Sequence, residues 1–312
     1  MSTLYLDRNH LRLRAAAGVI RVDPAGHGRG SYPVSLIRRI VLRGNTEFDS
    51  ASLACLAEAG ITVVCLGGRG HRRVATILGA PGPEARRRIA QYRAAVDPVA
   101  SSVLAAGFVC AKILACRHEA SRLLRRRPAL RKAGHDLDRT LRKTFDRIPD
   151  SELAVIRGLE GAASAAWFRF LAAALPSRFG FNGRNRQPPR DPVNAAMSLA
   201  YTLAHAEAVA ACHAQGLDPM IGFLHEPLHA RESLACDLIE PLRPRIDARL
   251  LRAFSDGTLR PEHFTAETNG CRLSKAGRSG FFETWEASAP LYRRYLRRVV
   301  LRLLRGLRET DA

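Results

Sequence analysis

Three places in the carboxy-terminal part of the chain put ionisable side chains where packing favours apolar ones. The first is Glu160, which lies on the apolar face of a helix predicted over residues 151–170. That face consists of Leu153, Ile156, Ala163, Trp167 and Phe170. A buried carboxylate without a partner is costly. Glu160 is therefore either a ligand for a cation or an edge residue that pairs with an arginine.

The second place is His225, which directly follows the apolar stretch Ile221–Leu224 in a loop that contains Gly216 and Pro219. Neutral imidazole is a common metal ligand. A single histidine beside apolar residues is, however, more often a core or loop residue than a ligand. Taken alone, His225 leaves both interpretations open.

The third place is the segment SLACDLIE, where Ser233 can cap a helix. Asp237 and Glu240 are three residues apart, so a helix puts both carboxylates on one face. They would repel each other unless a cation or an arginine lies between them. The alternative is a surface helix paired with nearby arginines. Pro241 adds a complication, because a residue before proline is biased away from helical geometry and Glu240 could be displaced.

Together, Glu160, His225, Asp237 and Glu240 form a set of carboxylates and one imidazole. Oxygen ligands with an imidazole suit Mg²⁺ or Mn²⁺. In a basic protein this set is typical of metal-assisted phosphodiester chemistry. The sequence alone does not show that the four residues converge in space.

The charge of the chain points to a polyanionic partner. Lys and Arg number 49 against 29 acids, a net charge of +20, and arginines far outnumber lysines. Guanidinium groups suit phosphate, which favours nucleic acid over a membrane surface. A high-GC genome also raises the arginine content and accounts for part of the excess. The seven cysteines are scattered and lack the close pairs of a zinc site, so we expect reduced thiols.

The hydropathy pattern favours a cytoplasmic protein without a membrane partner. We find no apolar run that approaches the ~20 residues needed to cross a bilayer. The amino terminus, MSTLYLDRNH, lacks the basic and then apolar arrangement of a secretion signal.

The order of the predicted elements indicates an α+β protein, with a β-rich domain over residues 1–82 and a larger α-helical domain over residues 83–312, which contains the candidate catalytic residues. Short apolar segments punctuated by Gly and Pro predict strands in the first part. These segments are Leu4–Leu6, Leu11–Leu13, Val19–Val22, Val34–Leu36, Ile40–Leu42, Ile61–Leu66 and Val74–Leu78. A short helix is predicted from Asp49 or Ser50 to Gly60, and a long one from Asp191 or Pro192 to Gly216.

The segment Phe181–Pro244 closely resembles the CRISPR-associated endonuclease and integrase of spacer acquisition, the Cas-one family, in the order and spacing of its motifs. Upstream, RGLEGAASAAWF resembles the Glu-Gly helix of that family. Weaker similarity extends through AEAGITVVCL and RRRIAQYRAA to FFETWE, so the resemblance covers nearly the whole chain. Arg157 and Ser164 depart from the family's pattern in the Glu-Gly helix.

The resemblance implies an enzyme that uses Mg²⁺ or Mn²⁺ and inserts short DNA spacers into a CRISPR array. A 3′-hydroxyl of the spacer would attack a phosphodiester of the repeat, and water in its place would give endonuclease activity. Glu160, His225 and Asp237 would bind the metal, and Glu240 matches the acidic catalytic position that follows.

The partners implied are double-stranded DNA, a second copy of the chain that pairs through the β-rich domain, and a small protein, the second core adaptation protein, that bridges two dimers. Three alternatives stay open at this point. They are an integrase of a mobile element that acts without the small partner, a nuclease that repairs branched DNA, and a DNA-binding scaffold without catalysis.

Overall fold

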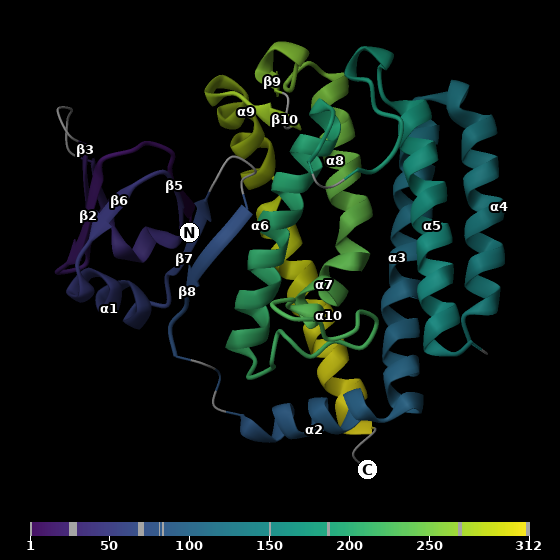
Figure 1. Ribbon diagram of the computed structural model, residues 1–312, viewed down its shortest axis with the longest axis horizontal. Coiled ribbons are helices and arrows are strands. Elements are labelled where there is room, and N and C mark those ends of the chain that lie inside the picture. Colours follow the sequence, from purple (N-terminus) through teal and green to yellow (C-terminus); the bar gives the residue numbers. More distant parts are fainter. Residues whose placement is uncertain are drawn as a thin grey trace. The chain divides into compact units, whose positions relative to one another are not determined.

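The computed structural model describes residues 2–24, 30–67, 72–80, 82, 84–149, 151–185, 188–267 and 270–309. The chain forms two compact units, which are described separately here (Figure 1). The first comprises Met1–Pro83 with His213–Gly216, and the second comprises Glu84–Cys212 with Leu217–Ala312. Strands dominate the first and helices the second, so the protein is α+β, as predicted.

Within residues 2–82, the described part of the first unit contains two four-stranded sheets and one α-helix. One sheet has the order β1 (Ser2–Leu6), β5 (Ile37–Arg43), β7 (Thr62–Gly67) and β8 (Arg72–Ile77). Its first three strands are parallel, and β8 is antiparallel to β7. The other sheet has the order β4 (Gly30–Pro33), β3 (Val19–Pro24), β2 (Leu11–Ala16) and β6 (Thr46–Phe48). Helix α1 spans Ser50–Glu58.

Alternation of side chains builds the core of this unit. In β2 every second residue is buried, and Leu13 is 1% exposed, because successive side chains of a strand point to opposite faces. Asp49 caps α1 by accepting a hydrogen bond from the Ser52 amide at 2.8 Å. The strand predicted at Val34–Leu36 is instead a 3₁₀ turn. At this point the chain leaves one sheet after β4 and enters the other at β5, so no ladder partner is available for these residues.

The second unit is a helical array with one β-hairpin. Its helices are α2 (Ala85–Val96), α3 (Pro98–Arg126), α4 (Arg131–Arg147), α5 (Leu153–Ala174), α6 (Pro192–Ala214), α7 (Ser233–Ile239), α8 (Arg243–Ser255), α9 (Lys275–Glu286) and α10 (Ala289–Glu309). Strands β9 (Phe264–Glu267) and β10 (Gly270–Leu273) pair antiparallel. The prediction of an all-helical unit missed this hairpin. The Asn-Gly pair at positions 269 and 270, where the second strand begins, is the local signal that could have found it.

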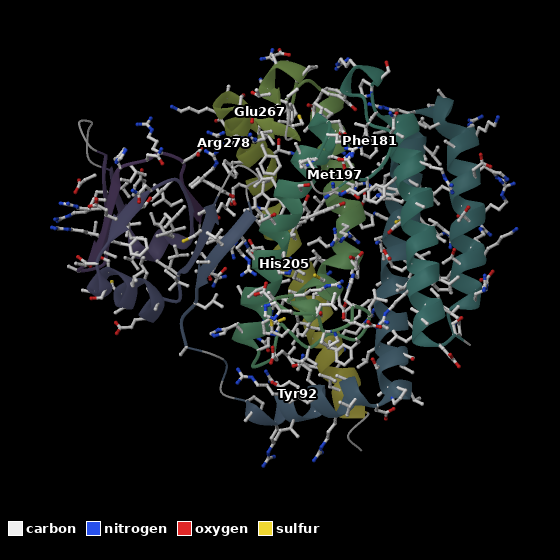
Figure 2. The ribbon with its side chains drawn as sticks, viewed as in Figure 1. Tyr92, Phe181, Met197, His205, Glu267 and Arg278 are labelled. Atoms are coloured by element: carbon white, nitrogen blue, oxygen red, sulfur yellow. The ribbon has the colours of Figure 1, made fainter. Side chains whose placement is uncertain are left out.

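Helix caps set the boundaries of the two long helices that matter for the site. Asp97 accepts hydrogen bonds from the amides of Val99 and Ala100, and so begins α3. Asp191 does the same for α6 through the Asn194 amide at 2.9 Å, as the Asp-Pro pair predicts. Helix α6 is buried along most of its length, and Figure 2 shows Met197 and His205 along it.

Helix α3 departs from the expectation that no segment is long and apolar enough to cross a bilayer. By length and composition it passes that test, alone among the helices of the described residues. Half of its apolar window is buried inside the structure, however. Since the core helix of a soluble protein passes the same test, α3 is weak evidence for a membrane span.

Candidate active site

Helices α3 and α5 and the short 3₁₀ turn η4 (Glu240–Leu242) bring one ammonium group and two carboxylates together. The Lys112 Nζ on α3 donates to Glu240 Oε2 at 2.5 Å and also to Glu160 Oε1. Its third partner is Ser164 Oγ at 2.7 Å, and the Ser164 hydroxyl donates to Glu160 Oε1. The side chains of Lys112 and Glu240 are only 5% and 4% exposed, whereas Glu160 is 22% exposed. Glu160 is thus the member of the cluster that faces solvent.

Asp237 lies at the end of α7 with its side chain fully buried, and both of its oxygens are engaged. Oδ2 accepts hydrogen bonds from the amides of Phe223 and Leu224 at 2.7 and 3.0 Å. Oδ1 accepts from the amide of His225 at 3.0 Å and lies 2.6 Å from the Nδ1 of the same residue. The carboxylate therefore holds the loop that carries His225 and fixes the ring through Nδ1.

Gly222 lies where the histidine loop passes close to α7, and its lack of a side chain makes this arrangement possible. A Cβ at this position would lie 2.8 Å from Asp237 Oδ2 and 2.8 Å from the Ser233 carbonyl carbon. Neither atom can move aside easily, since one belongs to a fully buried side chain and the other to the backbone. A side chain at position 222 would therefore push the loop away from Asp237.

Pro241 does not displace Glu240 from helical geometry. The backbone of Glu240 has φ −53° and ψ −48°, and its amide still donates to the Asp237 carbonyl. The chain only tightens into the turn η4 before α8 begins. The two carboxylates nevertheless meet different partners, Asp237 the histidine loop and Glu240 the lysine of α3.

Further polar side chains contact Glu240 and one another, beginning with Arg243. Arg243 Nε lies 2.8 Å from Glu240 Oε1, although its direction falls short of a hydrogen bond. The guanidinium also lies over the Tyr201 ring, 4.4 Å from its centre. Asp247 accepts hydrogen bonds from the Tyr201 hydroxyl at 2.5 Å and from the Trp167 indole at 2.9 Å. The two hydrogen bonds to Asp247 thereby join side chains of α5, α6 and α8 in the interior.

Burial and the contacts with neighbouring side chains have opposite effects on the pKa values of the buried carboxyl groups. Burial alone would raise the pKa of Glu240, but the positive charges of Arg243, Lys112 and His225 outweigh it and lower that pKa to about 2. Burial raises the pKa of Asp247 to about 6, although the hydrogen bonds from Tyr201 and Trp167 act against the rise. Glu240 is therefore held as an anion despite its burial.

Arg157 connects the histidine loop to the helix that carries Glu160. Its Nε donates to the Leu224 carbonyl at 2.6 Å, and its Nη1 pairs with Glu226. These two contacts lie on either side of His225 along the chain. Arg157 and Glu160 are three residues apart on α5, so the same helix face fixes both the loop and the carboxylate.

The structure thus brings together Glu160 and Glu240 through Lys112, and His225 with Asp237. The Glu240 amide donates to the Asp237 carbonyl, so the two pairs are neighbours. Among the described residues, no three His, Cys, Asp or Glu side chains are already grouped as a metal site. Sequence reasoning missed Lys112. Its signal was a lone lysine in the apolar stretch FVCAKILAC, as informative as Glu160 in its own helix.

A basic cavity of about 290 Å³ lies on three of the same helices, α3, α5 and α8. Arg122, Arg126 and Arg252 line it together with Trp167, whose indole supports Asp247. Burial, and then the like charges of Arg126, Arg249 and Arg122, lower the pKa of Arg252. Glu119 and Asp256 also line the cavity, and Arg122 pairs with Glu119 at 3.5 Å, but the arginines outnumber the acids and this excess of positive charge favours a bound anion.

Comparison with known proteins agrees with this architecture. The profile of the family described as CRISPR associated protein Cas1 matches residues 4–287. A curated relative, CRISPR-associated endonuclease Cas1 1 of Thermodesulfovibrio yellowstonii, is 33% identical over 291 residues, which is 92% of this chain and 91% of the relative.

Three solved structures share the fold. A Cas1 protein from Thermotoga maritima superimposes with a TM-score of 0.86 at 21% identity, covering 98% of this chain and 97% of the other. A casposase bound to integration product gives 0.82 at 22% identity, covering 92% and 82%. A Cas6-RT-Cas1–Cas2 complex gives 0.81 at 19% identity, covering 99% of this chain and 35% of that one. The match of the family profile to most of the chain, with the 33% identical relative, shows that this chain belongs to the Cas1 family.

Proposed function

We propose that this protein is a divalent-metal-dependent DNA integrase and endonuclease that inserts short DNA spacers into a CRISPR array. The observation that carries the proposal is that Glu160 and Glu240 both bind the Lys112 ammonium, close to a histidine that Asp237 holds in place. Family membership and a net charge of +20 supply the context for a DNA substrate.

The residues of the cluster fit a hard divalent cation. Two carboxylates and one imidazole are a suitable donor set for Mg²⁺ or Mn²⁺, and the Lys112 ammonium already puts a positive charge between the two carboxylates. We assign Glu160, His225 and Glu240 as the ligands. A bound ion would stabilise the charge on the attacking and leaving oxygens of a phosphodiester.

This assignment changes the role we predicted for Asp237. Both of its oxygens hold the amides and ring of the histidine loop, so a metal ion would have to compete with those hydrogen bonds. We propose that Asp237 orients His225 through Nδ1 and leaves Nε2 for the metal. Carboxylates commonly play this part behind a ligating histidine. Glu240, predicted as the acidic residue that follows the metal aspartate, becomes the third ligand.

In the proposed reaction the 3′-oxygen of the spacer forms a new bond to a phosphorus of the repeat. The bond from that phosphorus to the neighbouring nucleotide's 3′-oxygen breaks, so the number of phosphodiesters is conserved. The attacking hydroxyl gives up its proton to solvent, and the leaving oxygen takes up a proton from solvent. With water as the nucleophile the same displacement is hydrolysis. The basic cavity lined by Arg122, Arg126 and Arg252 is the candidate for holding the DNA backbone in line.

The partners follow from the family resemblance and from solved relatives. One relative of similar fold is a casposase bound to integration product, and another is part of a Cas6-RT-Cas1–Cas2 complex. We propose that this chain likewise binds DNA and a Cas2 protein, as two homodimers bridged by Cas2. The β-rich unit would pair the two copies of each dimer. We propose a cytoplasmic location for the assembly.

The test is strand joining on a supercoiled plasmid that carries a CRISPR repeat. The purified chain is supplied with Cas2, Mn²⁺ and a short duplex with free 3′-hydroxyls. Joined product is expected from the wild type but not from Glu160→Gln or Glu240→Gln. The control is Glu283→Gln, the same substitution at an exposed glutamate of α9, which should still give joined product. DNA binding, measured in parallel, should survive in all variants. Joining by the Glu160→Gln variant, or loss of DNA binding alongside joining, would contradict the assignment.

A second candidate is an integrase of a mobile element that acts without Cas2. The fold shared with a casposase favours it as the alternative. The same plasmid assay separates the two functions when Cas2 is omitted and the spacer duplex is replaced by the ends of a mobile element. Joining that needs the repeat and Cas2 supports spacer insertion, whereas joining that needs neither supports the mobile element.

A further inference from the structure

The Lys112 Nζ lies between two of the three proposed metal ligands, Glu160 and Glu240. An ammonium has three protons to donate, and each has an acceptor here: Glu160, Ser164 and Glu240. The lysine is buried, with a side chain 5% exposed, and the apolar residues Val109 and Ile113 flank it on α3. The charge of a lysine buried in this way is stabilised by its ion pairs and not by solvent.

The choice of lysine at this position is informative because the chain otherwise uses arginine. Only four of its 49 basic residues are lysines. A guanidinium presents a wide, rigid fork, whereas an ammonium is a compact point charge on a flexible four-carbon stem. Nζ can therefore lie between two carboxylates as a small cation would, and rotation of the stem can carry it away while α3 stays in place.

The two acids that bind Lys112 are those assigned to the divalent ion, so this inference rests on the proposed function. Glu160 Oε1 and Glu240 Oε2 cannot accept the ammonium and coordinate a metal in the same place at once. Without either cation, Glu160 and Glu240 would repel each other, and Arg243, 2.8 Å from Glu240 Oε1, would offset that repulsion on the Glu240 side alone. A cation between the two carboxylates therefore stabilises the site, and the chain supplies one of its own.

We propose that Lys112 is a built-in counter-ion that closes the carboxylate pair in the metal-free protein and must withdraw before a divalent ion binds. Ser164 holds the ammonium in the closed position, and its hydroxyl also bonds Glu160. Lys112 thereby stabilises the metal-free fold and weakens the affinity of the site for metal. One substitution should move these two properties in opposite directions.

The experiment measures Mn²⁺ affinity by electron paramagnetic resonance of the free ion, together with thermal unfolding in EDTA. Lys112→Met should bind Mn²⁺ about tenfold more tightly than the wild type, a usual size for coupling between two ligands. The same variant should unfold at a lower temperature in EDTA and regain stability when Mn²⁺ is added. Lys132→Met, at an exposed lysine of α4, is the matched control and should change neither property.

Ser164→Ala is the milder variant, because it removes one neutral acceptor of the ammonium and leaves the charges in place. It should tighten Mn²⁺ binding by about fivefold, the equivalent of one hydrogen bond, and it decides the matter should Lys112→Met fail to fold. Unchanged or weaker Mn²⁺ affinity in the folded variants, with wild-type joining intact, would overturn the role of Lys112 and spare the proposed function. Absence of Mn²⁺ binding in every variant would overturn both.

Discussion

Replacement of Asp237 by asparagine separates an orienting residue from a direct metal ligand. The carboxylate accepts two hydrogen bonds at each oxygen, three from backbone amides and one from the His225 ring. An asparagine must put its NH₂ group at one of the two oxygen positions. If the NH₂ takes the Oδ2 position, it faces the amides of Phe223 and Leu224. If it takes the Oδ1 position, it faces the His225 amide, and the ring keeps its hydrogen bond only by moving its proton from Nδ1 to Nε2.

The expected loss of stability follows from the one or two contacts that are lost. A hydrogen bond to a charged group contributes about 1.5–3 kcal/mol, so the loss amounts to about 1.5–6 kcal/mol. The group has no solvent to replace them, since Asp237 is completely buried. Metal affinity should fall by about 10–100-fold, the usual effect of losing the partner behind a ligating histidine.

Urea denaturation of the metal-free protein gives the first quantity, and Mn²⁺ titration gives the second. Glu160→Gln serves as the comparison, since it removes an assigned ligand whose side chain is partly exposed. It should abolish Mn²⁺ binding at a smaller cost in stability than Asp237→Asn, because glutamine keeps an oxygen that can accept from the Lys112 ammonium. The reasoning is refuted if Asp237→Asn keeps the stability within about 1 kcal/mol of the wild type but abolishes Mn²⁺ binding as completely as Glu160→Gln does.

Two further predictions concern charge. The lowered pKa of Glu240 means that its contribution to stability is present above its ordinary pKa of 4.5 and is lost as the pH falls toward about 2. Urea titrations give the difference in unfolding free energy between the wild type and Glu240→Gln. This difference should shrink by about 2 kcal/mol as the pH falls from 6 to 3, since each pH unit corresponds to about 1.36 kcal/mol. The raised pKa of Asp247 acts in the opposite sense, but it is present in both proteins and cancels in the comparison. Replacing Arg122, Arg126 or Arg252 with alanine should weaken DNA binding and reduce the salt dependence by about one phosphate contact each. Fluorescence anisotropy over a salt series measures it, and an unchanged slope would remove that arginine from the DNA path.

Local patterns in the sequence were enough to predict most elements that carry the site. The Asp-Pro pair at 191–192 marks the start of α6, and Asp49 marks the start of α1, because a cap is a contact between neighbours in the chain. Likewise, the Glu160 carboxylate on an apolar helix face indicated a cation before its partner was known. The hairpin of β9 and β10 was missed because helical neighbours on both sides dominated the prediction.

By itself the sequence determined the family, the α+β order of elements and the residue types available for chemistry, since these depend on composition, spacing and motif order. Only the tertiary structure decided which carboxylate does what. Asp237 and Glu240 are three residues apart and look equivalent in the chain, yet one meets the amides of residues 223–225 and the other meets Lys112, 128 positions away. Partners so distant in sequence are set by how α3, α5 and α7 pack. No local pattern contains that information.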